Sequence, residues 1–511
     1  MTCPEDIPTR PTRFAETQQE IIPVQIGEIA ERARALISGG GRMQMAYAWQ
    51  PLPDKIELRY LTSSSSRSPF VIWACRPEST MPSLAGICPL LGWYEREIAD
   101  LFGLTFAGHP EPQRLVLQEG AQPVLPPLDR RYPKDAPILV ECAERYAPEV
   151  AGDDTNVQML PFGPVRADVV ESAEFLFFYI GEQILHYHPR LFFKHRGMEK
   201  RFEGLLPEQA VVLAERVSGV GSFSHALAYC QALEAAAGCT PPKRARWLRV
   251  LLAELERLYN HLHYLGHLAD TTTLKVGQAE GKLLEERAKQ LNARLTGSRF
   301  LRSLLVPGGL RRDLAPESWL SEALEELRHP VAAYMRRSDG SDSHLDRLIT
   351  TGVLEHQVAL DQGATGPVQR ASGLDRDLRR DHPYAAYAEF RLTVPVEQAG
   401  DAYARFKVRL AEIDVSITLM QRLLLLLKPG PVRVECRPAP GSEGLGWCEN
   451  PRGSLFYAVH IGSDGHLTRV KIKSPSFSNW RAFPFTVHDS NMMDYAINEA
   501  SFGLTISGCA R

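Results

Sequence analysis

The sequence predicts an α+β protein in which a small α/β domain is followed by a mainly helical domain. Short apolar runs alternate with an amphipathic stretch in the N-terminal part, which is typical of a mixed α/β unit. Long patterns with apolar residues at helical spacing dominate the rest of the chain. A proline-rich stretch separates the two patterns and indicates a connector between the domains.

We predict four segments along the 511 residues. They are an N-terminal tail (1–19), a small α/β domain (20–118), a proline-rich connector (119–158) and a mainly helical domain (159–511). In the α/β domain, residues 26–36 predict a helix, and residues 56–61 and 69–74 predict strands. The connector contains six prolines and few periodic apolar residues, so we expect an extended segment that runs along a surface.

Long helices are predicted in the second domain at 243–268, 279–296, 317–336 and 399–427. The first, KRARWLRVLLAELERLYNHLHYLGHL, carries apolar residues around so much of its surface that it should be buried on most sides. Near the C-terminus, residues 455–461 and 467–472 predict a hairpin with a turn at Asp464 and Gly465.

Composition limits the classes of function. A net charge of -3 without a basic arm gives no reason to expect a nucleic-acid partner. The apolar run 423–427 is far shorter than the roughly 20 residues of a membrane span, and the N-terminus lacks a signal-peptide core, so we expect a cytoplasmic chain. Nine scattered cysteines form no C-x-x-C pair, and we expect neither an iron–sulfur cluster nor a zinc site in this chain.

Residues 92–117, GWYEREIADLFGLTFAGHPEPQRLVL, predict an amphipathic helix that Gly103 ends. The segment resembles the signature of the C-type subunit of bacterial NADH:quinone oxidoreductase, which is respiratory complex I. Its charged residues could take part in proton chemistry. We favour docking contacts for this set, which comprises Glu95, Arg96, Glu97 and Asp100.

Residues 215–234, ERVSGVGSFSHALAYCQALE, resemble the nickel-binding segment of hydrogenase large subunits. Glu215, Arg216, Gly219 and His225 keep that pattern. The four positions where the resemblance places thiolate ligands hold Ser218 and Gly221 here and, in the C-terminal SFGLTISGCAR, Thr505 and Gly508. Cys509 falls one place off. Serine, threonine and glycine do not replace soft thiolates, so the resemblance implies a scaffold without its nickel–iron centre.

Further motifs extend the resemblance over most of the chain. They are HRGMEK (195–200), PGG (307–309), E-x-P-R-G (449–453) and a run from Asp464 to Phe477. Together they resemble a fusion of the C-type and D-type subunits of complex I, the arrangement of formate hydrogenlyase and other group 4 membrane-bound hydrogenases. This implies an α/β domain like the C-type subunit, followed by a domain similar to the D-type subunit and the hydrogenase large subunit.

The sequence argues against a direct copy of the quinone pocket found in the D-type subunit of complex I. That subunit holds the quinone through a His-Pro-x-x-His run and a tyrosine, where this chain has GPVRADV (163–169) and Gly219. The carboxylate that pairs with the quinone histidine would fall at Asp270, or at Thr271 with a one-residue shift. Both quinone contacts are therefore replaced.

The resemblance places a candidate pocket at Glu215, His225, Asp270 and Arg452. Arg452 suits an anionic or carbonyl-bearing ligand, or it pairs with Glu215 or Asp270 and holds the fold. His225 is expected to be a core histidine. Glu199 in HRGMEK resembles a proton-path residue, although an exposed ion pair with Arg196 or Lys200 is the simpler expectation.

Two functions remain open. The first is an oxidoreductase subunit that takes electrons from an iron–sulfur small subunit and reduces an unidentified acceptor, with quinone as a candidate. The second is a non-catalytic coupling scaffold. In both, the resemblance implies a hetero-oligomer with membrane-embedded ion-translocating subunits, peripheral on the inner face of the cell membrane, with iron–sulfur clusters in the partners and no cofactor in this chain. GVGSFS (219–224) lacks the strand and acidic residue of a nicotinamide site.

Overall fold

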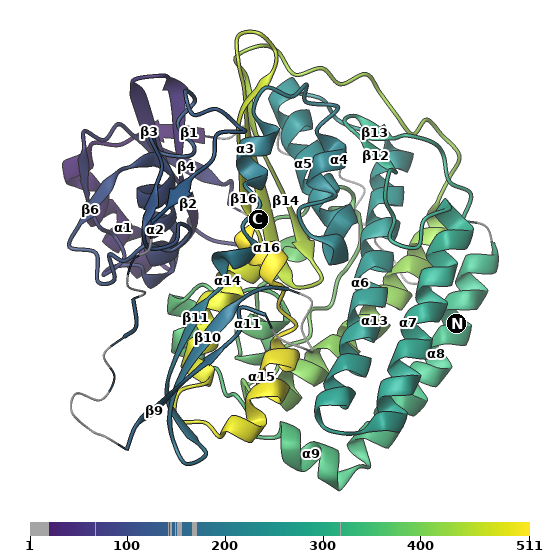
Figure 1. The fold of residues 1–511 in the computed structure, drawn as a ribbon. Coiled ribbons are helices and arrows are strands. Elements are labelled where there is room, and N and C mark those ends of the chain that lie inside the picture. The colour runs from purple at the N-terminus through teal and green to yellow at the C-terminus, as the bar shows by residue number, and fades with distance from the viewer. Residues whose placement is uncertain are drawn as a thin grey trace.

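A computed structural model describes residues 20–66, 68–141, 143, 146–148, 150, 156–165, 171–316 and 318–511. The tail predicted at 1–19 lies outside these residues. Figure 1 shows a small domain, purple to blue, beside a larger body in which a sheet separates this domain from a layer of long helices. Strands build the first unit and helices dominate the second, so the expected α+β class is confirmed.

The small domain is a four-stranded sheet with two helices. Its strand order is β1-β4-β3-β2, with β1 parallel to β4 and the other pairs antiparallel. The elements are β1 (Glu20–Pro23), α1 (Ile29–Ser38), β2 (Arg42–Leu52), β3 (Lys55–Ser63), β4 (Val71–Cys75), β5 (Thr80–Pro82), α2 (Gly92–Phe102) and β6 (Thr105–Ala107). Strand β2 is buried along most of its length because it contacts both α2 and the large body.

The charged side chains of α2, in the segment 92–117, have structural contacts. Gly103 ends the helix with a left-handed φ of 74°, as expected. The Asp100 carboxylate accepts hydrogen bonds from the backbone N–H groups of Leu115, Val116 and Leu117, at 2.9, 2.7 and 3.2 Å. Buried Glu95 accepts one from the Leu84 N–H at 2.7 Å. These two carboxylates therefore hold loops within the small domain, so the docking role expected for Glu95 and Asp100 was wrong.

Glu97 connects the small domain to the large body. Its carboxylate lies 2.7 Å from Arg511 and 2.6 Å from Lys471. Glu199 belongs to the same cluster, 2.7 Å from Arg469. All five side chains are buried. The simple expectation for Glu199 was therefore wrong, because α3 places it under β16, away from solvent and from Arg196 and Lys200.

The proline-rich connector lies on both domains. Arg130 donates its backbone N–H to Gln50 in the small domain at 2.9 Å. Lys200 of the large body donates to the Asp129 carbonyl oxygen at 2.9 Å. Two short strands, β7 (Ala121–Gln122) and β8 (Leu139–Val140), pair within it. Much of the connector is extended, as expected, although residues 142, 144–145, 149 and 151–155 lie outside the described part.

A three-stranded sheet follows the connector, and the sequence reasoning missed it. Its order is β11-β10-β9, with β9 (Gln158–Phe162), β10 (Glu174–Ile180) and β11 (Gln183–Arg190). The sequences EFLFFYI and QILHYHPR are rich in aromatic and branched residues, a pattern that favours strands. These strands were not predicted because we expected the second domain to be mainly helical.

The helical layer forms largely as predicted. Its long members are α5 (Ser222–Ala237), α6 (Lys243–Thr271), α7 (Lys275–Thr296), α8 (Ser318–Asp339) and α13 (Ala402–Leu426). Helix α6 packs against α5, α7 and α13 and is buried on most sides, as its apolar pattern indicates. Shorter helices are α3 (Met198–Phe202), α4 (Val211–Ala214), α9 (Asp342–Leu348), α10 (His356–Asp361), α11 (Pro367–Ala371), α12 (Leu378–Asp381), α14 (Pro475–Ala482), α15 (Tyr495–Phe502) and α16 (Ile506–Ala510).

The central sheet contains the predicted hairpin and one further strand. Strands β15 (Gly453–Ile461) and β16 (Leu467–Lys473) pair antiparallel, and β14 (Glu443–Asn450) pairs with β15. Glycine lets β14 lie directly beneath α5, because a Cβ atom at Gly444 or Gly446 would stand 2.0 Å from a carbonyl oxygen of that helix. Two glycines also weaken the strand pattern, which explains why β14 was missed.

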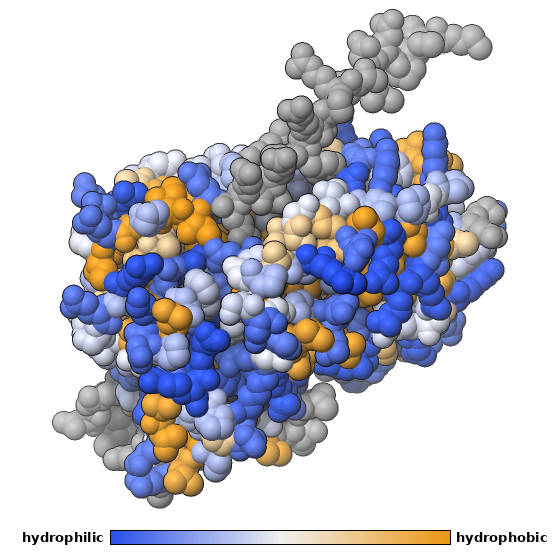
Figure 2. Space-filling model, turned by 90° about the horizontal axis from the view of Figure 1, so that it is seen from above, coloured by the Kyte–Doolittle hydropathy of each residue, from blue (hydrophilic) through white to orange (hydrophobic). Residues whose placement is uncertain are grey.

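The surface seen in Figure 2 is mostly hydrophilic, with apolar residues in separate patches. Within the described residues, no helix combines the length and the apolar character needed to cross a membrane.

Two further short strands, β12 (Leu305–Val306) and β13 (Gly309–Leu310), pair with each other.

Replacement of Glu97 by Gln should loosen the small domain. The substitution removes one of the two carboxylates that buried Lys471 and Arg511 share and leaves them Glu199 alone, so we expect the free energy of unfolding to fall by about 3 kcal/mol. Urea unfolding, followed by far-UV circular dichroism, measures it. Glu111→Gln is the matched control, since its side chain is 71% exposed in an ion pair with Arg96. Equal stability of the two variants would show that the Glu97 cluster does not hold the domains together.

Candidate functional site

Arg196 brings the two former ligand segments together. Its guanidinium donates to the carbonyl oxygens of Val217 and Ser507 at 2.5 and 3.1 Å, and to that of Arg216 at 3.0 Å. Val217 precedes Ser218, whereas Ser507 lies between Thr505 and Gly508. The site inferred from sequence therefore exists as a place in the fold, with segments almost 300 residues apart in contact with one side chain.

Two of the four former thiolate positions are filled by other side chains. A Cβ atom at Gly221 would lie 2.4 Å from the Asn450 amide nitrogen. At Gly508, a Cβ atom would lie 2.5 Å from the Thr505 hydroxyl oxygen. That hydroxyl accepts the Gly508 N–H at 3.2 Å, so Thr505 acts as the N-cap of α16.

The donor set does not fit a nickel–iron centre. Ser218 is buried but offers a hydroxyl in place of a thiolate. Cys509 is buried, and burial raises the pKa of its thiol, which disfavours the thiolate form that metals bind. Among the described residues, no three His, Cys, Asp or Glu side chains are grouped to hold a metal ion.

Arg452 has neither of the carboxylate partners proposed from sequence. Its Nε donates to the Gly503 carbonyl oxygen at 2.7 Å, and its Nη1 donates to the Asn260 amide oxygen at 2.8 Å. Among the described residues it forms no ion pair. Burial, followed by the charge of Arg409, lowers its pKa to about 10. The result is a half-buried cation that only neutral acceptors hold in place.

Asp270 is not brought to this cluster. It lies ten residues after Asn260 on α6, which corresponds to about 15 Å along the helix axis. Its carboxylate is 38% exposed and accepts a hydrogen bond from Lys275 at 2.6 Å. Thr271, the alternative position, donates its hydroxyl to the Leu268 carbonyl oxygen at 2.8 Å. We therefore leave both residues out of the site.

Glu215 and His225 are both buried beside the former metal position. Glu215 accepts the Ser303 N–H at 2.7 Å through one oxygen, while its other buried oxygen has no hydrogen-bond partner among the described residues. Burial raises the Glu215 pKa. His225 shares a hydrogen bond of 2.7 Å with the Tyr457 hydroxyl, and burial lowers its pKa to about 3. His225 is thus a neutral core histidine, which supports the structural interpretation.

Glu256 is a site residue that the sequence reasoning missed. From α6 its carboxylate accepts the N–H groups of Phe223 and Ser224 at 2.8 and 3.0 Å, and also the Ser224 hydroxyl. It thereby satisfies N–H groups at the start of α5. Burial raises its pKa to about 7, although Arg452 is near enough to oppose that shift. A signal existed, because Glu256 stands in the middle of a helix that is predicted to be buried on most sides.

The structure describes only some of the positions that the resemblance relates to quinone binding, which are 163–169 and Gly219. Residues 163–165 of the stretch 163–169 belong to the described structure, and 166–170 do not. Gly219 is exposed, with the Arg302 guanidinium 3.7 Å from where its Cβ atom would stand. A small exposed residue therefore occupies the position that the resemblance assigns to a tyrosine.

The titration of Glu256 predicts a pH dependence of stability. The folded chain keeps its proton up to about pH 7, whereas the unfolded chain releases it near 4.5, so this contribution to the free energy of unfolding falls as pH rises between these values. Glu256→Gln should flatten that slope in urea unfolding between pH 4.5 and 8. The control Glu435→Gln changes a carboxylate that is 74% exposed and should keep the slope. An unchanged slope in Glu256→Gln would contradict the assignment.

Different protein families match the N-terminal and C-terminal parts of the chain. Residues 25–137 match the family described as respiratory-chain NADH dehydrogenase, 30 Kd subunit, and residues 283–440 and 435–511 match the 49 Kd subunit. Residues 196–294, which include two of the four former thiolate positions, Ser218 and Gly221, match the nickel-dependent hydrogenase family.

Relatives of known name agree with these matches. Formate hydrogenlyase subunit 5 of Escherichia coli (strain K12) is 32% identical over 428 residues, which cover 82% of this chain and 75% of that protein. The C/D subunit of NADH-quinone oxidoreductase from Rhodopseudomonas palustris (strain BisA53) is 28% identical over 489 residues, or 84% and 82% of the two chains.

A solved structure shares the fold. It is a chain of the membrane-bound sulfane sulfur reductase, an archaeal respiratory membrane complex, with a TM-score of 0.66 and 25% identity over 71% of this chain and all of that one. From these similarities and its two-part fold, the chain belongs to the family of large subunits shared by respiratory complex I and the formate hydrogenlyase type of hydrogenase.

Proposed function

We propose that the chain is the large subunit of a membrane-associated oxidoreductase complex that works without a nickel–iron centre. Electrons would arrive from a partner iron–sulfur subunit and reduce an acceptor bound beside Arg452. The observation that carries this proposal is the guanidinium of Arg452, which is half-buried at the former metal site and lacks an ion-pair partner among the described residues.

A guanidinium of this kind suits an acceptor that gains negative charge on reduction. A quinone carbonyl fits this chemistry, since a quinone takes up two electrons and two protons to form a quinol. Glu256 supports the proposal because its carboxyl, with a pKa of about 7, holds a proton near neutral pH. An anionic sulfur chain is another acceptor that Arg452 would attract.

The names of relatives support a hetero-oligomer. The formate hydrogenlyase and NADH-quinone oxidoreductase relatives are both named as subunits, and the sulfane sulfur reductase is a membrane-bound complex. We propose an iron–sulfur small subunit and membrane-embedded ion-translocating subunits as partners. The chain would then be peripheral on the inner face of the cell membrane.

A coupling scaffold is the second candidate function. It is favoured by the filled former metal position, where Asn450 occupies the space beside Gly221 and Thr505 the space beside Gly508. The two cavities described for the chain lie elsewhere, and neither is lined by Glu215, His225 or Arg452. In this function the chain would transmit movement between partners without binding an acceptor.

Substitution of Gly221 by Ala tests whether the thiolate position is filled. The new Cβ atom would displace the Asn450 amide, and we expect the free energy of unfolding to fall by about 1 kcal/mol. Asn450→Ala should remove that collision, so the double variant should lose less than the sum of the single changes. Gly27→Ala is the control, since no atom lies within 4 Å of its Cβ position. Additive effects would indicate that Asn450 does not occupy the site.

Substitution of Arg452 by Gln in the intact complex distinguishes the two functions. An acceptor site should lose about a hundredfold in the rate of acceptor reduction. Reduction of the partner's iron–sulfur clusters, followed by electron paramagnetic resonance, should remain unchanged. Arg437→Gln, at a side chain that is 87% exposed, serves as the control.

Two outcomes would support the scaffold instead. One is full acceptor reduction in Arg452→Gln. The other is loss of assembly without a specific defect in the assembled fraction.

Elemental analysis of the same preparation tests the proposed absence of a nickel–iron centre, because about one nickel per chain would contradict it.

A further inference from the structure

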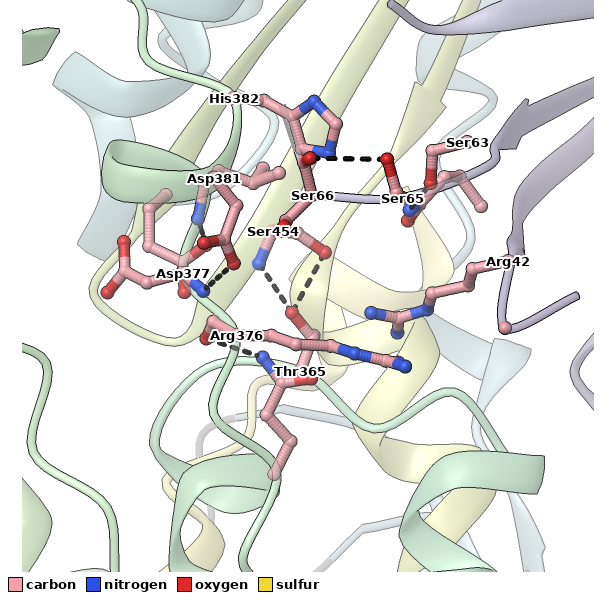
Figure 3. Close-up of a pocket in the computed structure, with 15 residues that line it drawn as sticks. Arg42, Ser63, Ser65, Ser66, Thr365, Arg376, Asp377, Asp381, His382 and Ser454 are labelled. Atoms are coloured by element: carbon pink, nitrogen blue, oxygen red, sulfur yellow. Dashed lines mark hydrogen bonds between the residues drawn. The ribbon is translucent and has the colours of Figure 1, made fainter. Parts of the chain in front are cut away.

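A small polar cavity lies between the two domains, and neither Arg452 nor any of the four thiolate positions lines it. Its volume is about 100 Å³. Figure 3 shows side chains from β2 and the loop after β3 on one side, and from the segment 364–382 and β15 on the other. The residues that matter for its chemistry are Arg42, Ser63, Ser66, Thr365, Arg376 and Ser454.

Two guanidinium groups point toward one another at this cavity (Figure 3). Arg42, from the small domain, donates to the Ala364 carbonyl oxygen at 3.2 Å, and its buried Nε has no hydrogen-bond partner in the described part of the chain. Arg376, from the loop between α11 and α12, likewise has a buried Nη1 without a partner there. Among the described residues, neither side chain forms an ion pair. The cavity thus has cationic donors that the described protein groups leave unused.

The carboxylates around the cavity already have other cations. Asp377 lies 2.7 Å from Arg379, and Glu449 lies 3.1 Å from Arg370. Asp381, which also lines the cavity, lies 2.8 Å from Arg380. None of these carboxylates forms an ion pair with Arg42 or Arg376, and the charges of Glu449 and Asp381 only partly offset the burial that lowers the pKa of Arg42 and of Arg376.

A third basic side chain stands behind the cavity. Buried Lys473 donates to the Ser454 hydroxyl at 2.7 Å, and burial together with the charges of Arg42 and Arg481 lowers its pKa well below the usual value. Burial, followed by the charge of Arg376, lowers the pKa of Arg42 to about 9. Each of these shifts reports cations held close together out of water.

We propose that this cavity binds a small oxyanion of the phosphate or sulfate class between Arg42 and Arg376. Planar guanidinium groups bind such anions through paired hydrogen bonds. The Ser63 and Ser66 hydroxyls line the same space. Because the two arginines belong to different domains, the bound anion would also stabilise the contact between them.

The size of the cavity restricts the ligand. A water molecule needs about 10–15 Å³ of such volume, so the cavity has room for several waters or one small oxyanion. Pockets for nucleotides and other large ligands measure roughly 300–1,000 Å³. A free inorganic anion is therefore the fitting ligand. This inference is independent of the function proposed for the Arg452 site.

Titration of the full-length chain with inorganic phosphate, followed by calorimetry, tests the proposal. Parallel titrations use sulfate, and chloride at matched ionic strength. We expect saturable binding of about one phosphate or sulfate per chain and no such binding of chloride. Arg376→Gln should weaken the affinity at least about tenfold, since it removes a charged donor. The control Arg437→Gln should bind like the parent, because that side chain is 87% exposed and does not line the cavity.

Thermal unfolding provides a second measurement. Phosphate should raise the midpoint of the parent and of Arg437→Gln, but not that of Arg376→Gln, because a ligand stabilises only the state that binds it. Arg376 lies in a loop, so its variant should keep the far-UV spectrum of the parent. If it does not, Arg376→Lys replaces it, with the same expectation of weaker binding. Absence of saturable binding in the parent, or equal affinity in the parent and the Arg376 variant, would overturn the proposal.

Discussion

The close approach of α5 to β14 is the constraint on which the site depends. Gly444 and Gly446 remove the side chains that would separate the strand from the helix, so carbonyl oxygens of α5 lie where Cβ atoms would stand. This contact places the end of β14 beside the start of α5. Asn450 consequently fills the space at Gly221, and Arg452, just after the strand, reaches Asn260 on α6.

Hydrogen bonds perform the structural task that metal ligands would perform in a nickel site. A metal ion bound by four thiolates would join the loop at Ser218 to the C-terminal segment at Thr505. Here the Arg196 guanidinium donates to carbonyl oxygens of both segments. The Thr505 hydroxyl caps α16, and Glu256 satisfies N–H groups of α5. Hydroxyl, amide and guanidinium groups therefore hold these segments together in this fold.

Buried charge also governs how the two domains meet. Glu97 of the small domain and Glu199 of the large one share cations from β16 and the C-terminus. Each carboxylate is costly to bury alone but is stabilised by the cations around it. At the proposed anion cavity the balance is reversed, since Arg42 and Arg376 meet across the same domain interface without a carboxylate of their own among the described residues. One part of this interface is thus complete within the chain, whereas the proposed anion would complete the other.

The sequence alone determined the fold class, the long helices and the C-terminal hairpin. Periodicity and motif spacing carry this information because it is local. Only the tertiary structure decided that Glu199 and Glu256 are buried, that Asp270 lies away from the cluster, and that the Asn450 amide fills the space beside Gly221. Those outcomes depend on which segments distant in the chain come into contact, and a local pattern does not specify such contacts.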